Sequence, residues 1–247
     1  MTENKASGIL SDINVEDIRL IVFDVDGTLA ETDDFFIDKG SVILCRLLPF
    51  VKAEKIERFF RSFVMVGETA LHGCYRLLDM VGLDTVISKA HSKMSVRGDY
   101  RYDQVKGAYD TVERLSRSYK LGIITSGGYR STQAFMEKTG ITDMISYVIS
   151  AEDCRFIKPH PLPLKKMAEK AGIPIERCLM VGDSVFDILC AKRAGARCAA
   201  VKTGFDMEFF LRWHHPDMLL DSVNDLPGII MQNQENDNSA GKKKDLV

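Results

Sequence analysis

The chain has 247 residues, of which 45% are hydrophobic, and its formal net charge at pH 7 is −2. A chain of this length and composition can bury a full core, and we expect one large domain with a smaller domain inserted into it. The nearly balanced charge excludes a strongly basic surface, so we expect neither nucleic acid nor a membrane as a partner.

The cysteines and the apolar segments indicate the cellular compartment of the protein. The six cysteines, at positions 45, 74, 154, 178, 190 and 198, include no CxxC pair. This pattern favours reduced thiols over disulfides or a zinc site. The start of the chain has no cationic segment followed by an apolar one, and no run reaches the roughly 18 apolar residues of a membrane span. We therefore expect a cytoplasmic protein.

Periodicity divides the chain into segments. Residues 1–18 are mixed and polar and form a predicted N-terminal extension. In residues 33–98, apolar side chains recur at spacings of three and four, which predicts helices. Residues 19–32 and 99–231 alternate between strand and helix patterns, which predicts an α/β core with a Rossmann-like parallel sheet flanked by helices. Residues 232–247 have almost no apolar side chains and are predicted to be disordered.

The first predicted strand, residues 19–24, ends in a carboxylate. Asp24 closes the strand, and Asp26 follows after one intervening residue. Ligands of open α/β sheets bind at the carboxyl ends of strands, so this pair predicts acid chemistry there. Asp24 can attack as a carboxylate while Asp26 handles a proton. Because neighbouring carboxylates repel each other unless a cation lies between them, the pair also implies a divalent metal. For this segment taken alone, an acidic turn remains the alternative.

A second apolar strand ends at a hydroxyl residue. Residues 121–124 are followed by Thr125, Ser126 and Gly127, just before a predicted helix. A hydroxyl group together with the free amides of a helix N-terminus can bind a phosphate group. The alternative is that the hydroxyl residue serves only as the N-cap of the helix.

Two further segments carry charged residues. Pro159 favours an extended backbone at Lys158, which can direct the ammonium group into the crevice; a solvated loop is the alternative. A third apolar strand, residues 178–182, ends at Asp183, and Asp187 follows four residues later on the same side of a predicted helix. One carboxylate can bind a hard cation directly while the other holds its water shell. Simple capping of the helix is the alternative.

In this order, the four segments resemble the motifs of the haloacid dehalogenase superfamily of phosphotransferases. The resemblance extends from about Leu20 to about Ile230. It implies that Asp24 is the nucleophile that forms an aspartyl-phosphate. It also implies that Asp26 is the general acid for the leaving group and the general base for the attacking water.

The resemblance also assigns the remaining site residues. Thr125 would hydrogen-bond the transferring phosphoryl group, and Lys158 would position the nucleophile and offset developing negative charge. The predicted phosphate-binding residues are Thr125, Ser126, Gly127 and Lys158. The implied cofactor is Mg²⁺. Its implied ligand residues are Asp24, Asp26 through its backbone carbonyl, Asp183, and Asp187 nearby.

The same resemblance narrows the activity to a phosphatase acting on a small phosphorylated metabolite, similar to phosphoglycolate or a sugar phosphate. Dehalogenase members of the superfamily lack the second carboxylate of the first motif, whereas Asp26 is present here. The helical segment at 33–98 resembles the cap domain of phosphoglycolate phosphatases and β-phosphoglucomutases. We expect a monomer or a homodimer.

Four alternative functions remain at this point. A phosphomutase of the β-phosphoglucomutase kind typically has a histidine shortly after the first motif, and residues 31–36 contain none. Pyrophosphatase and nucleotidase activities use the same core chemistry. A regulatory binding protein on the same fold is the non-enzymatic alternative, although it would have no need for a nucleophile and an acid two residues apart.

Overall fold

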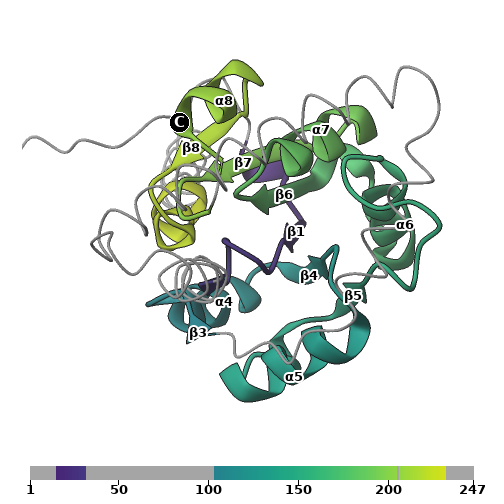
Figure 1. The fold of residues 1–247 in the computed structure, drawn as a ribbon, viewed down its shortest axis with the longest axis vertical. Coiled ribbons are helices and arrows are strands. Elements are labelled where there is room, and N and C mark those ends of the chain that lie inside the picture. The colour runs from purple at the N-terminus through teal and green to yellow at the C-terminus, as the bar shows by residue number, and fades with distance from the viewer. Residues whose placement is uncertain (1–14, 32–102, 205, 232–247) are drawn as a thin grey trace, which may run out of the picture.

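A six-stranded sheet forms the centre of the protein in this computed structural model, which describes residues 15–31, 103–204 and 206–231 (Figure 1). The strand order is β5-β4-β1-β6-β7-β8, and every neighbouring pair is parallel. The strands are β1 (Leu20–Phe23), β4 (Lys120–Ile124), β5 (Tyr147–Ile149), β6 (Cys178–Gly182), β7 (Arg197–Val201) and β8 (Met218–Leu220). The predicted parallel sheet is therefore confirmed.

The central strands are continuous apolar runs because both of their faces are covered. All four residues of β1 and all five of β6 are buried, as expected for parallel strands between two layers of helices. The α-helices of the described residues are α4 (Ala108–Ser116), α5 (Tyr129–Thr139), α6 (Leu162–Ala171), α7 (Val185–Ala194) and α8 (Glu208–Trp213). Residues 226–231 are also helical.

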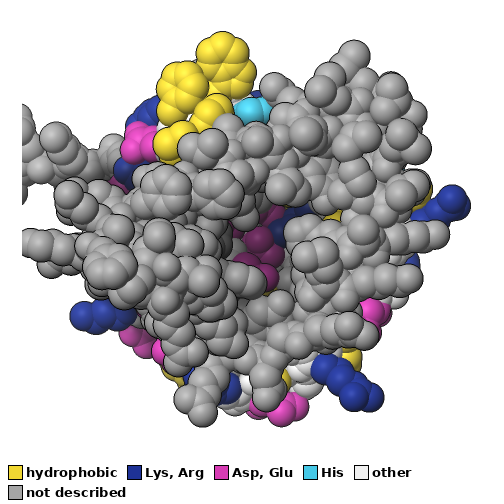
Figure 2. Space-filling model, viewed as in Figure 1, with side chains coloured by type: hydrophobic (Ala, Val, Ile, Leu, Met, Phe, Trp, Pro, Cys, Tyr) yellow, Lys and Arg dark blue, Asp and Glu magenta, His cyan; other side chains and the backbone are white. Residues whose placement is uncertain are grey.

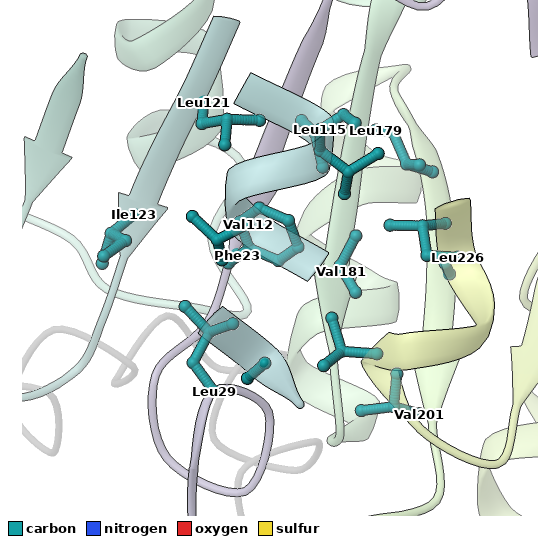
Figure 3. Close-up of a cluster of buried hydrophobic side chains, with 14 of the residues drawn as sticks. Phe23, Leu29, Val112, Leu115, Leu121, Ile123, Leu179, Val181, Val201 and Leu226 are labelled. Atoms are coloured by element: carbon teal, nitrogen blue, oxygen red, sulfur yellow. The ribbon is translucent and has the colours of Figure 1, made fainter. Parts of the chain in front are cut away.

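Alternate residues of each strand pack on opposite faces of the sheet. Ile21 and Phe23 of β1 belong to a buried cluster that includes residues of α4 and α5 (Figure 3). Leu20 and Val22 belong to a second cluster with residues of α6 and α7. The sheet is therefore covered by helices on both sides.

The predicted N-terminal extension reaches the core. Val15 and Ile18 are buried in the same cluster as Phe23, and a short 3-10 helix spans Val15–Asp17. The rest of that extension lies outside the described residues, and so do the whole predicted cap at 33–98 and the whole predicted tail at 232–247.

The two chain segments that flank residues 32–102 are hydrogen-bonded to each other. Strand β2 (Ala30–Glu31) pairs antiparallel with β3 (Asp103–Gln104), and the Val105 N–H donates to the Leu29 carbonyl at 2.9 Å. The chain therefore leaves the core and returns to it at adjacent positions. Among the described residues, no helix combines the length and the apolar character that crossing a bilayer requires.

Candidate active site

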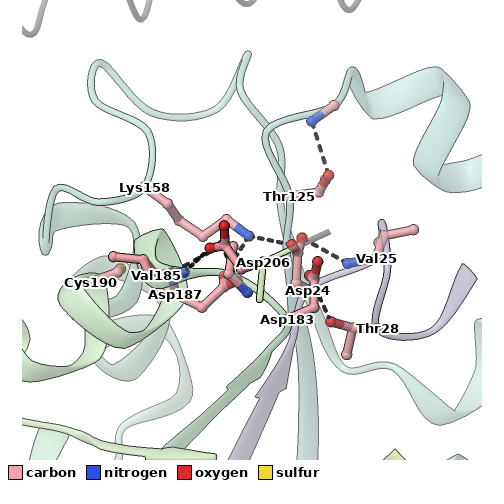
Figure 4. A network of polar contacts seen from close by, with 12 residues as sticks. Asp24, Val25, Thr28, Thr125, Lys158, Asp183, Val185, Asp187, Cys190 and Asp206 are labelled. Carbon is pink, nitrogen blue, oxygen red and sulfur yellow. Dashed lines mark hydrogen bonds and ion pairs between the residues drawn. The ribbon is translucent and has the colours of Figure 1, made fainter. Parts of the chain in front are cut away.

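Three of the predicted site residues follow neighbouring strands at the centre of the sheet. Asp24 comes directly after β1, Thr125 after β4 and Asp183 after β6. Because β4, β1 and β6 are adjacent and parallel, their carboxyl ends meet at one edge (Figure 4). In Figure 2, acidic and basic side chains lie next to each other near the centre of the face shown.

A tight turn after β1 fixes the direction of the Asp24 carboxylate. The Val25 N–H donates to Asp24 Oδ1 at 2.7 Å. The Val25 carbonyl accepts hydrogen bonds from three amides further along the turn, and Gly27 adopts the left-handed conformation with φ of 72°. Asp26 forms an isolated bridge to Ala30, and it is only partly buried whereas Asp24 is buried. The turn therefore separates the two carboxylates into different environments.

The ammonium group of Lys158 lies between two carboxylates. Lys158 Nζ is 2.7 Å from Asp24 Oδ2 and 2.7 Å from Asp187 Oδ1, and the residue is only 5% exposed. The solvated-loop alternative for Lys158 is therefore wrong. The buried cation holds the Asp24 carboxylate from the side opposite to the turn.

Helix α7 anchors the loop that carries Lys158. In addition to the Asp187 contact, the Cys190 Sγ–H donates to the His160 carbonyl at 3.3 Å, and Arg193 donates to the Pro159 carbonyl at 3.3 Å. Residues three apart on α7 thus contact the loop on one face of the helix. The position of Lys158 depends on these helix–loop contacts as well as on its ion pairs.

The Asp187 carboxylate both caps helix α7 and contacts a residue of the site. Ser184 is the N-cap of α7, and Asp187 Oδ2 accepts from the Ser184 N–H at 3.1 Å and from the Ser184 hydroxyl at 2.6 Å. The other oxygen, Oδ1, accepts from Lys158. This is a capping box, so part of the capping alternative is observed. Both carboxylate oxygens of Asp187 therefore have protein partners, as both oxygens of Asp24 do.

Asp183 has a less crowded set of polar partners. The Thr28 hydroxyl donates to Asp183 Oδ1 at 3.2 Å. Single oxygen atoms of Asp24, Asp183 and Asp187 all lie within 4.8 Å of one another. Three buried carboxylates around one point form an all-oxygen donor set, which suits a hard cation such as Mg²⁺.

Burial dominates the electrostatics of this cluster. It raises the pKa of Asp24 to about 7, with Lys158 lowering that pKa and Asp187 and Asp26 raising it. Burial and the Asp24 and Asp187 charges raise the pKa of Asp183 well above its ordinary value. Burial lowers the pKa of Lys158, but the two carboxylates more than offset this and leave it raised. Among the described residues, one cation faces three carboxylates, and the excess negative charge is what a divalent cation would neutralise.

Thr125, Ser126 and Gly127 form the turn into α5. Thr125 is buried, and its Oγ accepts from the Gly127 N–H at 2.9 Å. That bond leaves the hydroxyl proton of Thr125 available to donate elsewhere. Gly128, rather than a hydroxyl residue, is the N-cap of α5 and makes no side-chain cap bond. The simple N-cap interpretation of Thr125 and Ser126 is therefore wrong.

Sequence reasoning missed two residues of the site. Thr28 is fully buried and its hydroxyl donates to Asp183, but no motif in the sequence indicated it. Asp206 is 8% exposed and accepts from the Val185 N–H at 2.7 Å. It lies five residues after the apolar strand β7, so the same strand-end rule that indicated Asp24 and Asp183 could have found it.

Three known proteins are similar to this chain in sequence or in fold. Pyrophosphatase PpaX of Bacillus cereus strain AH820 is 28% identical over 215 residues, covering 86% of this chain and 96% of that protein. A predicted phosphoglycolate phosphatase from Haemophilus somnus 129PT has a TM-score of 0.58 at 20% identity, covering 86% of this chain and 98% of its own. An L-2-haloacid dehalogenase from Xanthobacter autotrophicus has a TM-score of 0.58 at 20% identity, covering 87% and 99%.

The family model for haloacid dehalogenase-like hydrolases matches residues 21–201, which is more than half of the chain and includes the Asp24, Thr125, Lys158 and Asp183 segments. The resemblance seen in the sequence is thereby confirmed, and the chain belongs to the haloacid dehalogenase-like hydrolase family.

Proposed function

We propose that the protein is a Mg²⁺-dependent phosphatase that transfers a phosphoryl group from a small phosphorylated metabolite to water through an aspartyl-phosphate on Asp24. The observation that supports this most directly is the setting of the Asp24 carboxylate. It is buried at a strand end, held by the Val25 N–H and by Lys158 at 2.7 Å each, and adjacent to two further carboxylates. A fixed, desolvated carboxylate beside a cation is suited to nucleophilic attack on phosphorus.

The donor set fits the proposed metal. Asp24 and Asp183 would hold Mg²⁺ directly, together with the backbone carbonyl of Asp26, and Asp187 would hold its water shell. Bound Mg²⁺ would offset the negative charge of the phosphoryl group and of the carboxylates. The excess of buried carboxylates over buried cations in the described part of the site supports this assignment.

In the first step, an Asp24 oxygen forms a bond to phosphorus while the bond to the leaving oxygen breaks and its electron pair goes to that oxygen. Asp26 protonates the leaving oxygen. Lys158 orients Asp24 and offsets charge that develops on the phosphoryl oxygens. The free hydroxyl proton of Thr125 donates to one of those oxygens, and the Gly127 N–H directs it by bonding to Thr125 Oγ.

In the second step, water attacks the phosphorus of the aspartyl-phosphate, and Asp26 takes the proton from that water. The bond from phosphorus to Asp24 breaks, inorganic phosphate leaves and the Asp24 carboxylate is restored. The partial exposure of Asp26 supports this role, because a residue that protonates a departing group and then activates water needs access to both.

Pyrophosphate is a second candidate substrate, because PpaX relatives at 28% identity are named pyrophosphatases. The two substrates differ in their need for an acid. An alkoxide leaving group requires protonation, whereas a phosphate leaving group is more stable as an anion. In single-turnover experiments, Asp26→Asn should therefore slow phosphorylation by an alkyl phosphate much more than phosphorylation by pyrophosphate.

The test of the proposed function is release of inorganic phosphate from p-nitrophenyl phosphate, pyrophosphate and a panel of sugar phosphates, with and without Mg²⁺. We expect Mg²⁺-dependent turnover of at least one substrate and none above background for Asp24→Asn. Acid-quenched protein should carry covalent phosphate only when Asp24 is present. Equal rates for the wild type and Asp24→Asn would favour the regulatory binding protein, and an isomerised sugar phosphate without phosphate release would indicate a mutase.

A further inference from the structure

The loop that follows β7 includes Thr203, Gly204 and Asp206. It reaches across the end of β6 to the turn after β1. The Thr203 hydroxyl donates to the Gly27 carbonyl at 2.6 Å. In the sheet, β6 lies between β1 and β7, so this hydrogen bond bridges over the strand that carries Asp183. The loop therefore connects the Asp24 turn to the side of the site that holds Asp183.

The backbone of this loop packs directly on the Asp183 carboxylate. A Cβ atom added to Gly204 would overlap Asp183 Oδ2, and one added to Gly27 would overlap the same oxygen. Asp183 Oδ2 thus lies between two glycine backbones, while Oδ1 accepts from Thr28. The carboxylate has little freedom to rotate, and any side chain at position 204 would displace it or the loop.

A buried carboxylate fixes the far end of the loop. Asp206 Oδ2 accepts from the N–H of Val185, the first residue of α7, at 2.7 Å (Figure 4). The first amides of a helix have no partner within the helix, and a carboxylate there is also favoured by the helix dipole. Because Ser184 and Asp183 immediately precede Val185, this bond ties the loop to the same segment that presents the metal-binding carboxylate.

We infer that Thr203, Gly204 and Asp206 are positioning residues that orient the Asp183 carboxylate for the divalent cation. This inference rests on the proposed function, since it assumes that Asp183 binds Mg²⁺. None of the three needs to contact the substrate. Thr203 and Asp206 attach the loop at its two ends, and Gly204 allows its backbone to lie against Asp183.

The decisive variant is Gly204→Ala, compared with the matched control Gly228→Ala. Gly228 has no atom within 4 Å of an added Cβ. Mg²⁺ affinity is measured by calorimetry without substrate, together with the unfolding transition and kcat at saturating Mg²⁺. We expect Gly204→Ala to weaken Mg²⁺ binding by about 10- to 100-fold, the usual effect of disturbing a group that supports a ligand, and Gly228→Ala to leave it unchanged.

Variants at the two ends of the loop keep the inference testable if the Gly204→Ala protein fails to fold. Thr203→Val removes the hydroxyl at nearly constant volume and should weaken Mg²⁺ binding by about 3- to 10-fold, whereas Thr203→Ser should restore it. Asp206→Ala should weaken binding more than Asp206→Asn, which keeps an acceptor oxygen. Folded variants at positions 203, 204 and 206 that all bind Mg²⁺ like the wild type would overturn the inference. A wild-type protein that binds no Mg²⁺ would instead overturn the proposed function.

Discussion

At the scale of single residues, the buried ammonium group of Lys158 is the cation that the described part of the site provides for its carboxylates. It lies 2.7 Å from oxygens of both Asp24 and Asp187. Removing one partner of a buried ion pair leaves uncompensated charge, which costs far more than breaking a pair at the surface. The contribution of Lys158 should therefore appear in stability as well as in activity.

We predict that Lys158→Met lowers the free energy of unfolding by about 3–5 kcal/mol in chelator at pH 7.5. The measurement is guanidinium-induced unfolding. The control is Lys138→Met, whose ion pair with Asp103 is exposed and should contribute less than about 1 kcal/mol. Similar small losses for both variants would contradict the idea that the buried pair is strongly coupled to folding.

The raised pKa of Asp24 predicts how stability changes with pH. The pKa rises from an ordinary value of 3.8 to about 7 in the folded protein, so the folded state holds a proton that the unfolded state has lost between those values. This contribution to stability is present below about pH 4 and is lost as the pH rises through about 7. Its size is up to about 4 kcal/mol.

In chelator, the stability of Asp24→Asn relative to the wild type should therefore increase between pH 4.5 and pH 7.5. Urea-induced unfolding of both proteins at the two pH values measures this difference. If the two proteins lose or gain stability in parallel over this range, Asp24 does not titrate there in the folded state.

At the scale of elements, the residues that cap the N-terminus of α7 also contribute to the candidate active site. Ser184 and Asp187 form a capping box, and the same Asp187 carboxylate accepts from Lys158. Ser222 and Asp225 form a second capping box after the edge strand β8. Ser222 caps a short 3-10 helix, Val223–Asp225, and its hydroxyl accepts from the Asn224 N–H. Because only the Asp187 box contacts Lys158, comparing the two separates the effect of capping from the effect on the site.

We predict that Ser184→Ala and Ser222→Ala each lower the free energy of unfolding by about 1 kcal/mol, the usual contribution of an N-cap side chain. Ser184→Ala alone should also lower turnover, because Asp187 loses the hydroxyl that orients it opposite Lys158. Thermal unfolding and phosphate-release assays on both variants provide the comparison. Unchanged turnover for Ser184→Ala would show that Lys158 alone holds Asp187 in place.

At the scale of the whole molecule, the β2–β3 ribbon indicates how residues 32–102 are connected to the core. Glu31 and Asp103 are direct partners in this antiparallel pair. A two-residue turn can join two strands of this kind. The described residues form the ribbon, the sheet and two buried clusters, and we expect them to fold as an independent unit.

We predict that replacing residues 32–102 by Asn-Gly yields a protein that unfolds cooperatively and still binds Mg²⁺. Circular dichroism, denaturant unfolding and calorimetry test this, with the full chain as the reference. Turnover of a small aryl phosphate should persist while selectivity among sugar phosphates falls, if the deleted segment contributes specificity. An insoluble product, or one without a cooperative transition, would show that the core needs this segment to fold.

Several features of the fold and the site follow from local patterns in the chain. Apolar runs ending in Asp24, Thr125 and Asp183 predicted three strands and placed their polar ends at one edge, because parallel strands share the direction of their carboxyl ends. Lys158 was less accessible to this reasoning. Its segment has no periodic pattern, and Pro159 indicated only that the ammonium group could reach the crevice. The role of Lys158 in the site came from the resemblance to a family.

The remaining features depend on contacts that local patterns do not encode. Thr28 and Asp183 are 155 residues apart in sequence, and Thr203 and Gly27 are 176 apart. The β2–β3 pair has two residues on each side, too few to show a period of two. Asp187 could be assigned to a helix cap or to the site from its spacing, and only the folded chain shows that it serves both.

The sequence by itself determined the parallel α/β architecture, the strand-end carboxylates and the membership of a hydrolase family, because apolar runs, helical periodicity and short motifs are local properties of the chain. The tertiary structure decided which carboxylates share Lys158, how Asp183 is enclosed by Thr28, Gly27 and Gly204, and where Asp206 binds. These depend on the distances between strands and loops far apart in the chain, which are set only when the two faces of the sheet are packed.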